Sequence, residues 1–409
     1  MIHQPPAGTK DLLPLEVIRK RWIAGCLRDV FNRWGYQRII TSTLEWLDTL
    51  TAGDAIKPET VIQVDGASQG RLGLRPELTA SIARAAVTRM VDDTLPLRLY
   101  YNANVFRRAQ QGHHGRQLEF YQMGVELLGA GGNLADTEIL LLLIDSLTQL
   151  GLTDWHIILG EANLTRALLA QFPSEHRAAV RQAIVNLDRL ALAALPLSDD
   201  LQTQAQMLFE LRGEPEVVLG RVSQLELDSA SRQIVNELKT LIARLRQTNP
   251  GQPLPITLDL TLLETIDYYT GVVFEVVSSQ QYQYRVLGKG GRYDQLLGLY
   301  EPQGQSQPGI GFALNIEDLQ TCLLDSDQLP QHKPTNDWLV IPKTPAAEAS
   351  AFVYGQQLRQ DEHYLVRVEM MLEHRSPEAI RDYAQASGIR RLAWVDTDGT
   401  PEIEVIEER

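Results

Sequence analysis

Short runs typical of β-strands lie on both sides of a long helical stretch, and this order restricts the fold more than any other feature. Residues 160–246 are dominated by Ala, Leu, Gln and Arg at helical spacing, which predicts a mostly helical subdomain. The strand-like runs lie at 97–102, 118–127, 155–159, 256–263, 271–278 and 283–288. The sequence therefore predicts one sheet that is interrupted by a helical insertion and resumes after it.

The run 118–127 is unusual for a strand because both of its faces mix polar and apolar residues. One face carries Phe120, Gln122 and Glu126, and the other carries Glu119 among apolar side chains. A strand on the protein surface would instead separate polar from apolar residues. We therefore expect this strand to form the floor of a polar pocket.

The remaining elements divide the chain into two predicted domains. Helices are expected at 15–35 and about 134–150, a strand at 36–44, and a final strand–helix–strand–helix–strand unit at 338–341, 346–359, 364–368, 377–387 and 391–395. The proline-rich segment Asn249–Pro255 ends the helical stretch, and the polar segment Asp325–Asn336 is a linker. We expect a core at 1–325, with the insertion at about 160–250, and a small α/β domain at 331–409.

Composition argues against several classes of protein. The 52 acidic and 38 basic residues give a formal charge of −14, which disfavours non-specific binding to phosphate backbones or anionic lipids. Cys26 and Cys322 form no close-spaced metal motif, which argues against a disulfide framework or a zinc site. No signal-peptide pattern is visible, and the longest apolar run, Ile139–Ile144, is too short to cross a bilayer. We expect a cytoplasmic protein without a metal, a cofactor or membrane contact.

Common catalytic motifs are absent, but four polar clusters stand out. The sequence has no phosphate loop, GxGxxG turn, HExxH helix or GxSxG elbow, and the pair His113–His114 fits an exposed loop better than a metal site. The clusters are Leu74–Thr79, Phe106–Arg107 with Gln122 and Glu126, Ile266–Gly271, and Gly290–Asp294. Each one alone fits a turn or a salt-bridged strand end better than a binding site.

Together these clusters belong to an ordered set of motifs. The blocks are Ala7–Pro14, Leu74–Thr79, Val105–Arg107, Glu119–Glu126, Ile266–Glu275, Gly290–Asp294 and Gly309–Leu314. Residues 5 to about 320 therefore resemble histidyl-tRNA synthetases, which carry such blocks in the same order. The resemblance implies an α+β fold with a class II synthetase core, in which helices flank an antiparallel sheet, and it implies self-association as a dimer.

The resemblance also implies a binding site for L-histidine. The matching positions are Glu77, Thr79 and Gln122 around the ammonium group, Glu126, Tyr269 and Tyr293 around the imidazole, and Arg107 as a retained cation. Carboxylate and amide acceptors suit an ammonium group, and a buried carboxylate with phenols can satisfy imidazole N–H groups.

The adenylation chemistry of the synthetases is not kept. Glu264 stands where the family has its catalytic arginine, Asp318 where an arginine supports ATP, and Ala109 where an acidic residue follows the motif arginine. Formation of an aminoacyl adenylate needs cations around the phosphates. A unit-charge pair about 4 Å apart is worth about 4 kcal/mol at an effective dielectric near 20, so each reversal suppresses the reaction about a thousandfold or more.

The C-terminal segment departs from the synthetases as well. Residues 331–409 contain nine basic and fourteen acidic side chains, a net charge of −5, whereas an anticodon-binding domain needs a basic face. In this combination the chain resembles the synthetase-like regulatory subunits of ATP phosphoribosyltransferase. That resemblance implies a non-catalytic protein that short catalytic subunits require within a hetero-octamer. It also implies that the protein responds to L-histidine as effector and binds no tRNA.

Two other functions stay open at this point. The chain could be a histidyl-tRNA synthetase, active or degenerate, or a histidine-binding scaffold for another partner. Glu264 also affects the expected ligand pose, because its carboxylate would repel that of histidine. We therefore expect either a rotated ligand, with Arg107 or the partner subunit supplying the cation, or a weaker site.

Overall fold

The computed structural model describes residues 3–54, 56–65, 70–108, 117–248, 254–262, 269–279, 284–324, 326–360 and 364–406. Contacts between residues separate the chain into two units, Met1–Pro330 and Gln331–Arg409. Among the described helices, none combines the length and the apolar character needed to span a lipid bilayer.

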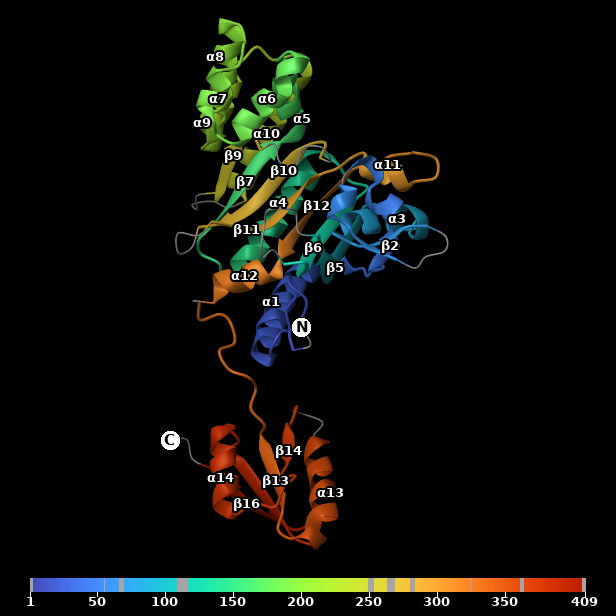
Figure 1. Ribbon diagram of the computed structural model, residues 1–409, viewed down its shortest axis with the longest axis vertical. Helices are drawn as coiled ribbons and strands as arrows, with labels where there is room; N and C mark the ends of the chain where they lie inside the picture. Colours follow the sequence, from blue (N-terminus) through green and yellow to red (C-terminus); the bar gives the residue numbers. More distant parts are fainter. Residues whose placement is uncertain are drawn as a thin grey trace. The chain divides into compact units, whose positions relative to one another are not determined.

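The larger unit is built on one mixed sheet (Figure 1). Its described strands follow the order β1-β5-β6-β12-β11-β10-β7-β9-β8. They are β1 (Gln37–Arg38), β5 (Leu97–Phe106), β6 (Glu119–Leu128), β12 (Gly309–Asn315), β11 (Arg285–Arg292), β10 (Val272–Ser278), β7 (Trp155–Glu161), β9 (Ile256–Asp259) and β8 (Arg212–Gly213). The strands from β5 to β7 are antiparallel, as expected, and the α+β class is confirmed. The β1–β5 and β7–β9 pairs are parallel, because a long crossover connects the two strands of each pair.

Helices cover both faces of this sheet. The helices on one face are α1 (Pro14–Arg33), α4 (Gly132–Gln149) and α12 (Ile316–Leu323), and those on the other are α3 (Thr79–Arg89) and α11 (Leu296–Tyr300). On the first face, Leu27 and Leu143 pack into one apolar cluster with Val125 of β6. On the second face, Ile82 and Leu296 pack in a smaller cluster that leaves room for polar residues.

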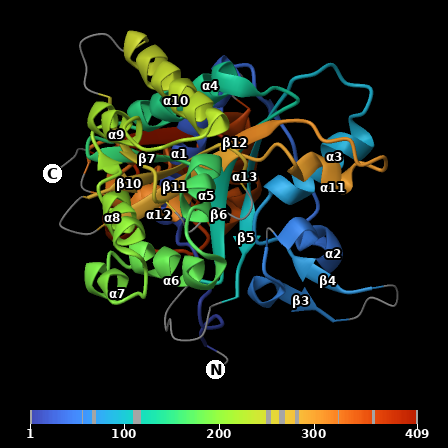
Figure 2. The ribbon, with the colours of Figure 1, turned by 90° about the horizontal axis from the view of Figure 1, so that it is seen from above.

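The insertion lies at one end of the sheet. Its elements are α5 (Ala162–Ala170), α6 (Ser174–Val185), α7 (Arg189–Ala193), α8 (Asp199–Leu208), α9 (Pro215–Val222) and α10 (Ser229–Gln247). The predicted helical stretch is therefore confirmed, and the chain returns to the sheet in β9, beside β7. Figure 2 shows α6 to α9 on one side of the sheet. On the other side lie α2 (Leu47–Leu50), α3 and the small antiparallel sheet of β2 (Leu44–Trp46), β4 (Leu72–Leu74) and β3 (Ile62–Val64).

The C-terminal unit is a four-stranded sheet between two helices. Its elements are β13 (Trp338–Pro342), α13 (Glu348–Arg359), β14 (Val368–Met370), α14 (Pro377–Ala386), β15 (Arg391–Val395) and β16 (Pro401–Val405). The strand order is β14-β13-β15-β16, with the first three parallel and β16 antiparallel. Ala351 of α13 packs on one face of the sheet and Ile380 of α14 packs on the other. The predicted α/β unit is confirmed.

Two strand predictions need correction. The expected strand at 36–44 pairs only at Gln37–Arg38, because the chain then leaves the large sheet and next pairs in the small sheet at Leu44. The expected strand at 364–368 lies instead at Val368–Met370. Tyr364 and Leu365 lie before this strand and are 77 % and 78 % exposed.

Candidate ligand-binding site

Three glycines open the middle of the sheet face that lies under α3. Strand register places Gly124 and Glu126 of β6 beside Ala313 and Gly311 of β12, and Gly291 of β11 follows Gly311. A side chain at position 311 would collide with the carboxylate of Glu126. The glycines therefore leave space for large polar groups on this face.

Those polar groups form a cluster around Glu126, which we call the carboxylate–tyrosine cluster. Its members are Glu77, Thr79, Tyr101, Glu126, Tyr269 and Tyr293. The hydroxyl of Thr79 donates to Oε1 of Glu126 at 2.7 Å, and the hydroxyl of Tyr293 donates to Oε2. Glu126 is 1 % exposed. Burial raises its pKa to about 8, although the two hydrogen bonds oppose this shift; the nearby carboxylate of Glu77 adds to it.

Glu77 is the second carboxylate of the cluster and also starts α3. Its side chain accepts hydrogen bonds from the backbone N–H groups of Thr79 and Ala80, the second at 2.9 Å. These bonds satisfy donors that the first turn of a helix leaves unpaired. Burial raises the pKa of Glu77, and its hydrogen bonds and the charge of Arg107 oppose this shift. Thr79 thus connects the two carboxylates, through its N–H to Glu77 and through its hydroxyl to Glu126.

Arg107 is held at the margin of the cluster. Its Nε donates to the carbonyl oxygen of Pro76 at 2.9 Å, and its guanidinium carbon lies 5.3 Å from the ring centre of Phe120. Arg107 is exposed, while Glu77, Thr79 and Tyr269 are only half-buried. The cluster can therefore be reached from solvent on the side of Glu77 and Arg107.

Tyr101 and Tyr269 supply two further phenols. Burial raises the pKa of both well above the ordinary value, and the charges of Glu126 and Glu77 reinforce the shift. Both hydroxyls therefore keep their protons and can donate to an anion or accept from a cation.

Gln122 lies on the same face of β6, four residues before Glu126. It is 8 % exposed, and its Oε1 has no hydrogen-bond partner in the described part of the protein. A buried acceptor left without a donor costs about 1–3 kcal/mol, so such an atom needs an explanation. An N–H donor from a ligand would satisfy it.

Asp318, one of the three positions with a reversed or lost catalytic group, lies in the first turn of α12. Its Oδ1 is 3.3 Å from Nη1 of Arg285, and its backbone N–H donates to Oδ1 of Asn315. Burial raises the pKa of Asp318, and Arg285 opposes this shift. The other two positions, Glu264 and Ala109, lie outside the described residues.

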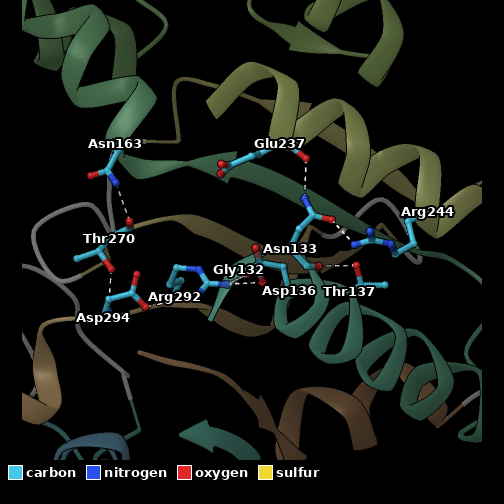
Figure 3. Close-up of polar contacts among 10 residues, drawn as sticks. All are labelled: Gly132, Asn133, Asp136, Thr137, Asn163, Glu237, Arg244, Thr270, Arg292 and Asp294. Atoms are coloured by element: carbon cyan, nitrogen blue, oxygen red, sulfur yellow. Dashed lines mark hydrogen bonds and ion pairs between the residues drawn. The ribbon is translucent and has the colours of Figure 1, made fainter. Parts of the chain in front are cut away.

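A second polar group lies between α4 and the insertion (Figure 3). Arg292 is buried and forms ion pairs with Asp136 and Asp294, beside a cavity of about 200 Å³. Nδ2 of Asn163 on α5 donates to the carbonyl of Thr270 at 2.7 Å, and the Thr270 hydroxyl accepts from the N–H of Asp294. Thr270 follows directly on Tyr269, and Arg292 and Asp294 flank Tyr293, so the two polar groups share two segments of the backbone.

Comparison with known proteins identifies the family. A family profile described as "Histidyl-tRNA synthetase" matches residues 8–319. A protein of Gloeothece citriformis is 60 % identical over 410 residues, and one of Nostoc sp. strain PCC 7120 is 56 % identical over 408 residues. Each alignment covers 100 % of both chains, and both relatives are named "ATP phosphoribosyltransferase regulatory subunit". The chain belongs to the family of ATP phosphoribosyltransferase regulatory subunits.

Solved structures agree with this family of regulatory subunits. A Bacillus halodurans crystal structure titled as an ATP phosphoribosyltransferase regulatory subunit/histidyl-tRNA synthetase is 26 % identical, with a TM-score of 0.78, over 94 % of this chain and 97 % of that one. A histidyl-tRNA synthetase from Nostoc sp. PCC 7120 shares the fold at 21 % identity and a TM-score of 0.71, over 97 % of this chain and 92 % of that one. The synthetase-like fold expected from the motifs is confirmed.

The structure brings most of the predicted histidine-site residues of this regulatory subunit together. Glu77, Thr79, Glu126, Tyr269 and Tyr293 belong to one cluster, and Arg107 and Gln122 lie beside it; that they bind histidine stays a prediction. Tyr101 was not expected there. The consecutive tyrosines at 100 and 101 on one strand were a usable signal, because neighbouring strand residues face opposite sides, so one of the two must lie on the face that carries the cluster.

Proposed function

We propose that this chain is the non-catalytic regulatory subunit of an ATP phosphoribosyltransferase and binds L-histidine as effector in the carboxylate–tyrosine cluster. The observation that carries this proposal is the environment of Glu126. Its carboxylate is buried, and within the described structure it accepts hydrogen bonds only from hydroxyl groups. A buried carboxylate of this kind favours a ligand that brings N–H donors.

The surrounding acceptors suit both parts of histidine that carry N–H groups. Glu77 and the unpartnered Oε1 of Gln122 can accept from an ammonium group. Glu126, with Tyr269 and Tyr293 beside it, can accept from an imidazole N–H. Arg107 lies beside Glu77 and can meet the ligand carboxylate, which supports the rotated pose expected from the charge of Glu264.

The lost cations support a regulatory rather than a catalytic role. Asp318 carries a negative charge where the synthetases use an arginine for ATP, and it already pairs with Arg285. Together with Glu264 this change removes the positive charge that adenylation needs. Arg107, a cation of the synthetase motif, is retained. For this reason a histidyl-tRNA synthetase, active or degenerate, stays the second candidate function.

Charge also argues against tRNA as a ligand. The net charge of residues 331–409 is −5, and several basic side chains in this unit are neutralised by glutamates. Lys343 lies 3.0 Å from Glu402, and Arg381 pairs with Glu404. Such a surface offers few cations to a phosphate backbone.

The proposed assembly follows from the family. The partner is the short-form catalytic subunit, a glycosyltransferase of histidine biosynthesis, in a hetero-octamer built on dimers of this chain. Cys26 and Cys322 are unpaired thiols, which supports a reducing, cytoplasmic location. No cofactor is required for this role.

Three measurements test the proposal. Calorimetric titration of the full chain with L-histidine should show one site, which Glu126→Ala abolishes and Glu119→Ala, on the other face of the same strand, keeps. Unchanged affinity in Glu126→Ala would place the effector site elsewhere.

ATP–pyrophosphate exchange with histidine should be absent, since clear exchange would make the chain a synthetase. Failure to bind and activate a short phosphoribosyltransferase would favour the scaffold.

A further inference from the structure

We infer that histidine and Glu126 hold one proton between them in the complex, so that the site selects an amino acid whose side chain is a neutral base of the imidazole type. This inference rests on the proposed function, because it concerns the same cluster. It adds the protonation state of the bound pair and the chemical reason for ligand selection.

The geometry gives the cluster one negative charge too many. Thr79 links the carboxylates of Glu77 and Glu126, and each sits within the electrostatic reach of the other. In the described part of the protein, no ion pair joins Glu126 to a lysine or arginine. Arg107 acts on Glu77, so one cation serves two carboxylates. A proton on Glu126 removes the excess charge.

The groups that face Glu126 from neighbouring elements do not change this balance. Tyr101 comes from β5, Tyr269 from the segment before β10, and Tyr293 from the end of β11; on the opposite face of β6 lies Tyr36. Burial raises the pKa of Tyr36, Tyr101 and Tyr269, so these three phenols stay neutral at physiological pH. Among the residues that the structure describes, the surroundings of Glu126 thus supply hydroxyl groups and a second carboxylate, but no further positive charge.

Titration behaviour supports the same conclusion. The pKa of Glu126 is about 8, so the carboxyl group is mostly protonated at pH 7 before the ligand binds. An ordinary imidazole has a pKa of about 6.5 and is mostly neutral at that pH. The two partners therefore already have one proton between them when they meet, and binding needs no exchange of protons with water.

This sharing predicts a characteristic pH profile for histidine affinity. Affinity should be constant between about pH 6.5 and 8, where the protein supplies the proton and the ligand is neutral. Above about pH 8 it should fall about tenfold per unit, because Glu126 must first regain its proton. Below about pH 6.5 it should fall about tenfold per unit, because the imidazolium must first lose one.

The experiment is calorimetric titration of the full chain with L-histidine from pH 5.5 to 9. At pH 7, titrations in two buffers of different ionisation enthalpy should give no net proton uptake or release. The control is Glu126→Gln, which keeps the size of the side chain but cannot titrate. Any fall in its affinity at high pH therefore measures the deprotonation of the ligand's own ammonium group. β-(2-Thienyl)alanine, whose ring has a similar shape but no basic nitrogen, should bind at least about tenfold more weakly than histidine at pH 7, and equal affinity would contradict selection for a base.

Three outcomes would decide against the inference. Affinity that rises steadily through pH 8, with one proton released per histidine, would show that Glu126 is ionised and the imidazole neutral in the complex. Affinity that rises as the pH falls from about 8 to 6.5, with one proton taken up per histidine, would show that the pair holds two protons. Absence of histidine binding at every pH would overturn the proposed function itself, and this inference with it.

Discussion

Glu126 has consequences for stability as well as for binding. Burial raises its pKa to about 8 in the folded chain, whereas an unfolded chain has the ordinary value of about 4.3. Because the folded-state pKa is higher, the folded chain holds more protons than the unfolded chain between these two values. The stability that the protonated carboxyl contributes is complete below about pH 4.3 and is lost as the pH rises to about 8.

We therefore expect the pH dependence of unfolding to change in Glu126→Gln. In the wild type, Glu126 lowers the free energy of unfolding by up to about 1.4 kcal/mol per pH unit between about pH 5 and 8. The variant lacks this contribution but keeps those of Glu77 and Asp136, whose pKa values are also raised by burial. Urea unfolding of both proteins at pH 5.5, 6.5 and 7.5 gives the contribution as a difference. Equal slopes in the two proteins would contradict the assigned protonation of Glu126.

Gly311 is the second residue whose replacement gives a clear test. A methyl group at this position meets the carboxylate of Glu126 and the backbone carbonyl of Val125. We expect Gly311→Ala to lower the free energy of unfolding by about 1–3 kcal/mol and to abolish histidine binding, because Glu126 must move. The matched control is Gly25→Ala in α1, where a methyl group meets nothing within 4 Å. Urea unfolding and calorimetry measure the two effects, and equal behaviour of the two variants would refute the packing argument.

At the level of elements, α5 holds the backbone that carries Tyr269. Nδ2 of Asn163 donates to the carbonyl of Thr270 at 2.7 Å, and Nη2 of Arg166 donates to the carbonyl of Tyr269 at 2.8 Å. The two side chains also bond to each other, at 2.7 Å. The first helix of the insertion is therefore fastened to the segment that lines the cluster.

This attachment predicts an effect of the insertion on binding. We expect Asn163→Ala to weaken histidine binding about fivefold, because a lost hydrogen bond of about 1 kcal/mol leaves Tyr269 less well positioned. The control is Asn186→Ala, at the exposed end of α6 in the same insertion. Titration calorimetry compares them. If both variants bind histidine like the wild type, α5 has no part in positioning the cluster.

Sequence patterns predicted a helix or strand well where the burial of its side chains determines it. They predicted it poorly where contacts with distant residues determine it. The mixed faces of β6 indicated a polar floor because Gln122 and Glu126 cannot belong to an apolar core, and both are indeed buried on one face. The strand β16 could not be predicted. Its Glu402 and Glu404 resemble a solvent-exposed segment. They pair with Lys343, which follows β13, and with Arg381 of α14.

The same limit applies to the site. Its motif residues could be predicted from their order in the chain, but strand register is not visible in a sequence. Only register shows that Tyr101 lies opposite Gly124, and that the tyrosine side chain fills the space where a side chain at 124 would be. Two neighbouring residues of the motif Gly290–Asp294 also belong to different polar groups, which the sequence did not indicate. Tyr293 donates a hydrogen bond to Glu126, whereas Arg292 forms an ion pair with Asp136.

At the scale of the whole molecule, the negative charge of this chain supports the proposal that it does not handle tRNA. The formal charge of −14 is spread over both units, and the smaller unit contributes −5. Contacts separate at Pro330, and we propose that the core at 1–325 and the segment 331–409 fold as separate domains. Each unit has its own apolar clusters, which supports this proposal.

This charge distribution predicts that tRNA is not retained by the full chain. Binding to a phosphate backbone gains affinity from the counterions that lysines and arginines release, and it weakens steeply with salt. Here Lys343, Arg375 and Arg381 are engaged with glutamates, so we expect no measurable tRNA binding at about 150 mM salt. Fluorescence anisotropy with labelled histidine tRNA measures this, with a histidyl-tRNA synthetase as the positive control. A binding constant that falls steeply as the salt concentration rises would reveal a basic groove. That result would favour a histidyl-tRNA synthetase over a regulatory subunit.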